Sequence, residues 1–218
     1  LAYLFLDVFL VLTGWLFFQN YFLIGQANMR GFFSLMPWLF LFLIPAITMR
    51  SFAEERKLGT DELLLTMPLS ESEIVMGKFL AGAIILLLTF LFSLVIPLIV
   101  GFSGDPDFGV ITASYIGAFL YGLSSLSIGL YLSATTDNQI IAFLLTLVFT
   151  FLLFLIGDFY VLQVLPGFLV PIFQLVGSGT HFDGLTRGVL DSRDLLYFFS
   201  VIVLFLLLTT RLLFKKRD

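Results

Sequence analysis

The chain has 218 residues, of which 60% are hydrophobic and only 12% are charged, and its net charge is −4. Soluble domains carry roughly 25% charged residues, so this chain lacks the polar surface of a soluble protein, and a lipid bilayer is its expected surrounding. The acidic balance argues against a nucleic-acid partner. The absence of cysteine excludes disulfides and thiolate metal sites, and the presence of only one histidine argues against a histidine-based metal centre.

Apolar runs of about 20 residues, the length that crosses a bilayer, predict an all-α membrane protein with six transmembrane helices in a single domain. The predicted spans cover approximately residues 1–23, 32–50, 70–101, 109–133, 138–162 and 194–214. The first span begins at Leu1, inside an apolar run that has neither a methionine nor a basic leader. A signal peptide would need a basic leader, so this run is not read as one. Because the chain starts inside an apolar run without a methionine, we expect natural N-terminal residues upstream of Leu1.

The polar segment 51–73, between the second and third spans, is predicted to contain a short capped helix. Gly59 can end the helix that continues from the second span, because glycine adopts the left-handed conformation cheaply. Thr60 is a good N-cap for the next helix, and acidic residues follow it in the first turn. Ser70 and Glu73 have the spacing of a capping box, which places the start of the third helix near Ser70. The alternative is an ordinary loop with one surface helix.

The fourth predicted span carries a stripe of small residues at helical spacing. Its members are Ser114, Ala118, Gly122, Ser125, Gly129 and Ser133. Small residues at this spacing let two helix backbones approach closely. We interpret the stripe as a packing face, within the bundle or between subunits, with a substrate-facing groove as the alternative.

Residues 163–193 do not fit a span, because their apolar stretch is only about 13 residues long and contains two prolines. Segments of that length are more often re-entrant or interfacial, so a re-entrant element is predicted before the last helix. Lysine and arginine predict the orientation, since they concentrate on the cytoplasmic side. Eight of them (Arg50, Arg56, Lys57, Lys78, Arg211, Lys215, Lys216 and Arg217) fall on the side of the 51–73 segment. Three (Arg30, Arg187 and Arg193) fall on the other side, so both termini are expected in the cytoplasm and the re-entrant element outside it.

A dense polar cluster precedes the last span. It contains His181, Asp183, Arg187, Asp191, Arg193 and Asp194. The sequence has no second histidine, nucleophile elbow or zinc-protease motif, which argues against catalysis. We expect the cluster to tie down the re-entrant element and to form an extracytoplasmic gate or partner surface. Asp7 and Asp158 lie near the ends of spans, where interfacial or structural roles are expected.

Two segments resemble a known family. The stretch Glu54-Glu-Arg-Lys-Leu-Gly-Thr-Asp-Glu-Leu-Leu-Leu-Thr-Met-Pro-Leu-Ser-Glu-Ser-Glu-Ile-Val-Met-Gly-Lys78 closely resembles the segment after the second span of ABC-2-type permeases. The stretch His181–Ser200 resembles the one before the last span in the subgroup related to gliding-motility and nitrous-oxide-reductase accessory permeases. The resemblance covers essentially the whole chain. The family also has an amphipathic helix before its first span, which agrees with the expectation of upstream residues.

The resemblance implies that the 51–73 segment is a coupling helix that docks in a groove of a separate cytoplasmic ATPase. The residues that match this role are Glu54, Glu55, Arg56, Gly59, Thr60, Glu62, Leu63 and Leu64. Gly77-Lys78 has neither the earlier glycine nor the following serine or threonine of a P-loop, so this chain is not expected to be an ATPase. ATP and magnesium are expected on two copies of the partner ATPase, with no cofactor in this chain.

The resemblance further implies a permease subunit of an exporter in the bacterial cytoplasmic membrane, paired with a second copy or a paralogue. The alternative is a mechanotransmission subunit that passes ATP-driven motion to a membrane-anchored extracytoplasmic accessory protein without moving a solute. An intramembrane enzyme is a third alternative, which the lack of a catalytic constellation opposes.

Overall fold

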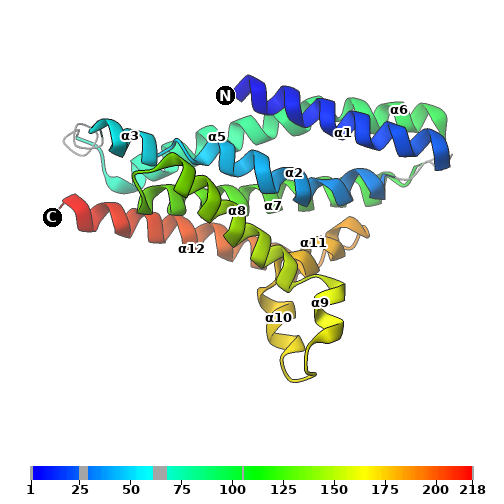
Figure 1. Cartoon of the computed structure of the whole chain (residues 1–218). Coiled ribbons are helices and arrows are strands. Elements are labelled where there is room, and N and C mark those ends of the chain that lie inside the picture. Colours follow the sequence, from blue (N-terminus) through cyan, green and yellow to red (C-terminus); the bar gives the residue numbers. More distant parts are fainter. Residues whose placement is uncertain (1, 25–28, 61–67, 105, 218) are drawn as a thin grey trace.

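The computed structural model describes residues 2–24, 29–60, 68–104 and 106–217, and these form helices and turns without a strand. In chain order the helices are α1 (Ala2–Ile24), α2 (Arg30–Thr48), α3 (Ala53–Leu58), α5 (Glu71–Ser93), α6 (Val95–Ser103), α7 (Phe108–Thr135), α8 (Gln139–Ile156), α9 (Phe159–Val164), α10 (Val170–Val176), α11 (Ser178–Thr186) and α12 (Ser192–Arg217). Figure 1 shows α1, α2, α5, α7, α8 and α12 lying side by side, each running opposite to the one before. The prediction of an all-α protein is therefore confirmed for the described residues.

Among the described residues, five helical stretches are long and apolar enough to cross a membrane. They are Arg30–Leu58, Glu71–Phe102, Phe108–Thr135, Gln139–Ile156 and Ser192–Lys215. In α1 the apolar stretch Tyr3–Gln19 falls short of that length. The predicted count of six spans therefore stays a prediction.

The third predicted span is interrupted between α5 and α6. Pro97 has no amide proton, so the carbonyl of Ser93, four residues earlier, loses its helical partner. Tyr115 of α7 replaces that partner, because its hydroxyl donates to the Ser93 carbonyl at 3.2 Å and lies 3.1 Å from the Ser93 hydroxyl. Together the stretch Glu71–Phe102 has 32 residues, or about 48 Å of helix, so it extends beyond the hydrocarbon layer of a bilayer.

Stacked and edge-on aromatic rings connect the helices through the core. The ring centroids of Phe9 and Phe40 are 5.7 Å apart, those of Phe40 and Phe90 5.9 Å, and those of Phe40 and Tyr121 6.3 Å. Tyr121 continues the series to Phe198 of α12 at 6.1 Å. Such pairs contribute about 0.5–1.5 kcal/mol each beyond their buried area. The series joins α1, α2, α5, α7 and α12 into one unit.

Helix α7 is central and packs against α2, α5, α8, α11 and α12. All six members of the predicted small-residue stripe are buried on it. A Cβ atom at Gly129 would overlap the side chain of Thr48 on α2. One at Gly122 would lie 3.4 Å from both Phe40 and Leu86. Gly122 and Gly129 of the stripe therefore pack against α2 and α5 within this chain.

The fifth predicted span, residues 138–162, is helical as α8 only to Ile156. Gly157 ends the helix, and its backbone touches that of Gly177, between α10 and α11. Helices α9 and α10 then project beyond the bundle as a hairpin with no buried residue, as Figure 1 shows at the bottom. The hairpin falls where a re-entrant element is predicted, and its position in a membrane stays a prediction.

Candidate functional site

One end of the bundle holds α3, the start of α5, the end of α7 and the last turns of α12, and is called here the α3 end (Figure 1). Most of the predicted ATPase-contacting residues lie there: Glu54, Glu55, Arg56, Gly59 and Thr60. Glu62, Leu63 and Leu64 lie outside the described residues. The opposite end, which holds α9, α10 and α11, is called the hairpin end.

Gly59 ends α3 in the way its sequence predicts. Its backbone is left-handed, with φ at 68°, and its amide donates to the carbonyls of Arg56 and Glu55. The Thr60 amide also donates to the Glu55 carbonyl, at 2.9 Å. These bonds satisfy carbonyls that a helix end would otherwise leave open.

A serine from a distant helix caps the start of α3. The residue at the N-cap position, Phe52, has no side-chain group that can cap. The hydroxyl of Ser133, near the end of α7, accepts from the amides of Phe52 at 3.1 Å and Ala53 at 3.2 Å. It also donates to the carbonyl of Met49 at 3.3 Å, and its side chain is fully buried. Ser133 therefore joins the end of α7 to the turn between α2 and α3.

Arg56 makes a second link between α3 and α7. Its guanidinium donates to the carbonyl of Ala134 at 2.6 Å. Because α7 ends at Thr135, this carbonyl is among the last four of the helix, which lack a helical partner and carry the negative end of the dipole. A cation is the favoured partner there.

Lys78 of α5 makes the third link. Its ammonium group donates to the carbonyl of Ser51 and to the carboxylate of Glu55, and lies 4.6 Å from the ring centroid of Phe52. The side chains of Lys78 and Glu55 are 19% and 32% exposed, so solvent screens this pair only partly. We call Ser133, Arg56, Lys78 and Glu55 the α3 clamp, since together they fasten α3 to α5 and α7.

The other side of α3 faces away from the bundle. Lys57 and Leu58 are exposed, and the Leu58 side chain is 68% exposed despite being apolar. Glu54 forms a loose surface pair with Arg50 at 3.9 Å. This face offers charged and apolar groups to another molecule.

The predicted capping box is present at the start of α5. The Ser70 hydroxyl accepts from the Glu73 amide at 3.4 Å, and the Glu73 carboxylate accepts from the Ser70 amide at 2.8 Å. Helix α5 therefore begins at a defined residue next to the α3 clamp.

We expect Ser133→Ala to loosen the start of α3 without disturbing α7. Losing a helix N-cap costs about 1 kcal/mol, which corresponds to roughly fivefold faster hydrogen exchange of the amides it protected. Exchange of a peptide covering residues 49–58 would measure this. The matched control is Ser127→Ala, also buried on α7, whose hydroxyl donates only within its own helix, to Ser124 at 2.7 Å. Equal exchange in both variants would refute the cap.

At the hairpin end, the polar cluster before α12 divides into separate contacts. His181 of α11 pairs through Nδ1 with Asp194 of α12 at 2.7 Å, and its ring stacks on Tyr197 at 4.1 Å. Its Nε2 lies 3.3 Å from the carbonyl of Leu175, so the ring also ties α11 to α10. Asp183 pairs with Arg187 on the exposed side of α11.

The remaining acids singled out from the sequence act in helix capping or lie at the surface. The Asp191 carboxylate accepts from the Arg193 amide at 2.9 Å, at the start of α12. Asp158 accepts from the Tyr160 amide at 2.9 Å and caps α9, whereas Asp7 is exposed on α1. Within the described part of the chain, no group of three histidines or acids could hold a metal ion. His181, Asp183 and Asp191 therefore make separate contacts, and their role in a gate or partner surface stays a prediction.

Two members of the α3 clamp are not predictable as such from the sequence. Ser133 is predicted only as part of the packing face, and Lys78 only as a cytoplasmic basic residue at the end of the family-like stretch. Glu55 and Lys78 are 23 residues apart and of opposite charge, which is a weak signal for pairing. Nothing local marks Ser133, whose partners lie about 80 residues earlier.

The similarity of this chain to a known protein family covers both ends of the bundle. A model of the family described as ABC-2 family transporter protein matches residues 8–213. A comparison with curated proteins found no match. The matched range includes the α3 clamp, the hairpin, all of α2, α5, α7 and α8, and most of α1 and α12.

Proposed function

The chain belongs to the ABC-2 transporter family, and from this premise we propose that it is the permease subunit of an ATP-driven exporter. A separate ATPase binds ATP and magnesium and docks on the exposed face of α3 and the segment that follows it. This chain binds no cofactor and converts the movement of α3 into movement of the spanning helices.

The observation that carries the proposal is the α3 clamp. A short helix could swing freely if only its two ends held it. Here the Ser133 and Arg56 bonds tie α3 to the end of α7, and Lys78 ties it to α5. Because α7 packs against most of the other long helices, a push on α3 reaches the whole bundle as a rigid-body rotation.

Two of the predicted coupling residues, Glu55 and Arg56, bond within the chain and position α3. Lys57 and Leu58, which are not among the predicted residues, are exposed and form part of the docking surface. Leu63 and Leu64, outside the described residues, are proposed for the same surface from the family resemblance.

The proposed orientation places the α3 end and both termini in the cytoplasm of a bacterium. Helix α1 crosses the membrane in addition to the five candidate spans, which makes six. Two ATPase copies and a second permease chain, identical or paralogous, complete the transporter. A path for cargo then lies between the two permease chains.

The exposed hairpin favours a second candidate function, the transmission of ATP-driven motion to an extracytoplasmic partner protein. Val164, Phe168 and Leu175 are all more than two-thirds exposed on it, which is a surface suited to a partner. The two functions differ in liposomes that contain only permease and ATPase. Cargo-stimulated ATP hydrolysis there supports transport, whereas hydrolysis that responds only to an added extracytoplasmic protein supports transmission.

We expect Leu58→Ala combined with Leu64→Ala to abolish co-purification of the ATPase. If each leucine is buried on docking and contributes about 1.5 kcal/mol, the affinity falls about a hundredfold. Leu175→Ala, which truncates an exposed leucine at the hairpin end, is the matched control and should leave the complex intact. An unchanged complex in the double variant would show that this surface does not dock the ATPase.

A further inference from the structure

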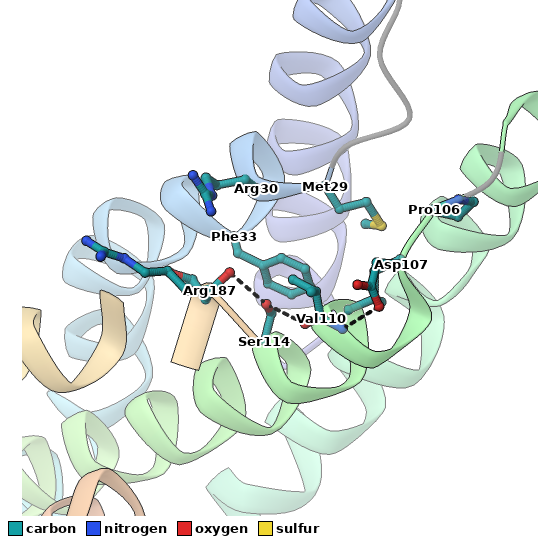
Figure 2. A pocket seen from close by; sticks show the side chains of 10 residues that line it. Met29, Arg30, Phe33, Pro106, Asp107, Val110, Ser114 and Arg187 are labelled. Atoms are coloured by element: carbon teal, nitrogen blue, oxygen red, sulfur yellow. Dashed lines mark hydrogen bonds between the residues drawn. The ribbon is translucent and has the colours of Figure 1, made fainter. Parts of the chain in front are cut away.

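Two adjoining cavities open at the hairpin end. The larger, of about 650 Å³, lies between α2, the end of α8, the α9–α10 hairpin and α11. The smaller, of about 280 Å³, lies between the start of α2, the start of α7 and the end of α11. Arg30, Thr186 and Arg187 line both. Figure 2 shows Arg30 from α2 and Arg187 from the end of α11, with both guanidinium groups reaching away from Asp107.

The two arginines bring positive charge together from distant parts of the chain. Two acids, Asp158 and Asp183, also line the larger cavity, but both already have partners. Asp158 caps α9, and Asp183 pairs with one terminal nitrogen of Arg187. A guanidinium has five N–H donors in a planar fork, so this pair leaves Arg187 with donors for a further anion.

Aromatic and aliphatic side chains line part of the larger cavity. Trp38 follows Arg30 by eight residues on α2, which is about 12 Å along the helix. Its ring is 51% exposed and packs edge-on against Phe154 at 5.8 Å. Phe159 and Leu162 of α9 also line the cavity, next to Asp158. A cavity lined by two guanidinium groups and, about 12 Å from Arg30 along α2, by aromatic rings matches an amphiphile with an anionic head.

We propose that the larger cavity binds a glycerophospholipid from the surrounding bilayer. Its phosphate lies between Arg30 and Arg187, since a guanidinium group can donate two parallel hydrogen bonds to phosphate oxygens. An acyl chain runs along Trp38 and Phe154. The cavity volume lies within the 300–1,000 Å³ typical of ligand pockets, so it takes the head and the upper part of a chain. This binding does not depend on the coupling role of the α3 end.

The chain supplies its own reporter for this site. It has two tryptophans, and Trp15 is 72% exposed on α1. Trp15→Phe therefore leaves Trp38 as the single tryptophan, in the cavity wall. The full-length Trp15→Phe protein in maltoside micelles is titrated with dibrominated phosphatidylglycerol and, separately, with dibrominated diacylglycerol, which lacks the phosphate. Bromine quenches tryptophan only at short range.

The phospholipid is expected to quench Trp38 at a much lower concentration than the diacylglycerol. Arg30→Gln and Arg187→Gln should each raise the half-quenching concentration about fivefold, and the double variant should remove the preference for phosphate. Arg193→Gln, which alters the third arginine of the hairpin end but not either cavity lining, is the matched control. Melting curves check that every variant is folded.

Three results would overturn the proposal. The first is equal quenching by both lipids in the Trp15→Phe protein, and the second is an unchanged preference in the folded double-arginine variant. The third is complete release of the lipid by millimolar inorganic phosphate, since the apolar part of the lining would then contribute nothing. Retention of the lipid against free phosphate supports it.

Discussion

Gly177→Ala is expected to destabilise the bundle by about 3 kcal/mol or more and to lower its melting temperature by several degrees. A Cβ at this position would overlap the Cα and N atoms of Gly157 and lie 2.9 Å from the carbonyl oxygen of Phe173. A flexible side chain can rotate away from a new methyl group, but backbone atoms cannot. The junction must therefore open, which separates α11 from the end of α8.

Neighbouring glycines show that this contact is a crossing of two backbones. A Cβ at Gly157 would lie 2.7 Å from the Thr180 amide nitrogen, and one at Gly179 would lie 2.6 Å from the Phe154 carbonyl oxygen. Close backbone approach through small residues is a common way to join helices in a membrane. The prediction follows that Gly157→Ala has a similar effect.

Gly167→Ala is the control, because this glycine lies between α9 and α10, ten residues before Gly177, and a Cβ added there meets nothing within 4 Å. Its effect should stay within about 0.5 kcal/mol. Melting curves in one detergent compare the three proteins. If the Gly177→Ala protein melts together with the control, the backbones do not touch at this junction.

This glycine junction also explains why the fifth predicted span is too long as a helix. The apolar run continues through Phe159–Val164, so hydropathy extends the span to residue 162. The helix stops at Ile156 because the backbone of Gly157 packs against Gly177, twenty residues further along the chain. A contact between segments at that separation leaves no periodic signal in either.

Features that depend on a few consecutive residues were predictable. The capping box at Ser70 and the left-handed end of α3 at Gly59 both follow from local backbone chemistry, and both are present. The small-residue stripe on α7 is also periodic, and its burial agrees with the packing interpretation. Its partners, Thr48, Phe40 and Leu86, could not be predicted, because helix spacing shows a face but not its neighbour.

The candidate site was predictable as a segment but not as a set of contacts. Family resemblance marks Glu54–Lys78 and implies an ATPase beside it. It does not separate the side chains that face the partner from those that bind within the chain. Glu55 pairs with Lys78 and Arg56 bonds to Ala134, and only the tertiary arrangement of α3, α5 and α7 reveals this.

Lys78→Met is expected to uncouple the transporter while leaving the ATPase bound. Lys78 holds α3 to α5 through the Ser51 carbonyl and the Glu55 carboxylate. Among the described residues, the second oxygen of that carboxylate, Oε2, is buried without a hydrogen-bond partner. Removing the Lys78 ammonium group therefore leaves the half-buried Glu55 carboxylate without its ion-pair partner. Breaking a fully buried pair costs about 3–5 kcal/mol, and the partial exposure of this pair reduces the expected cost to about 2 kcal/mol.

A double-mutant cycle separates this pair from a general loss of packing. Glu55→Gln removes the charge that Lys78→Met leaves behind, so the double variant should regain about 1 kcal/mol of the loss, and the two effects should not add. Because neither side chain lies on the exposed face of α3, all three variants should still co-purify with the ATPase. Stimulation of ATP hydrolysis by the membrane subunit should fall in Lys78→Met and recover in Lys78→Arg. Additive losses of stability, or full stimulation in Lys78→Met, would mean that movement passes from the ATPase to α5 without this pair, and the Ser133 and Arg56 links to α7 would then be the route.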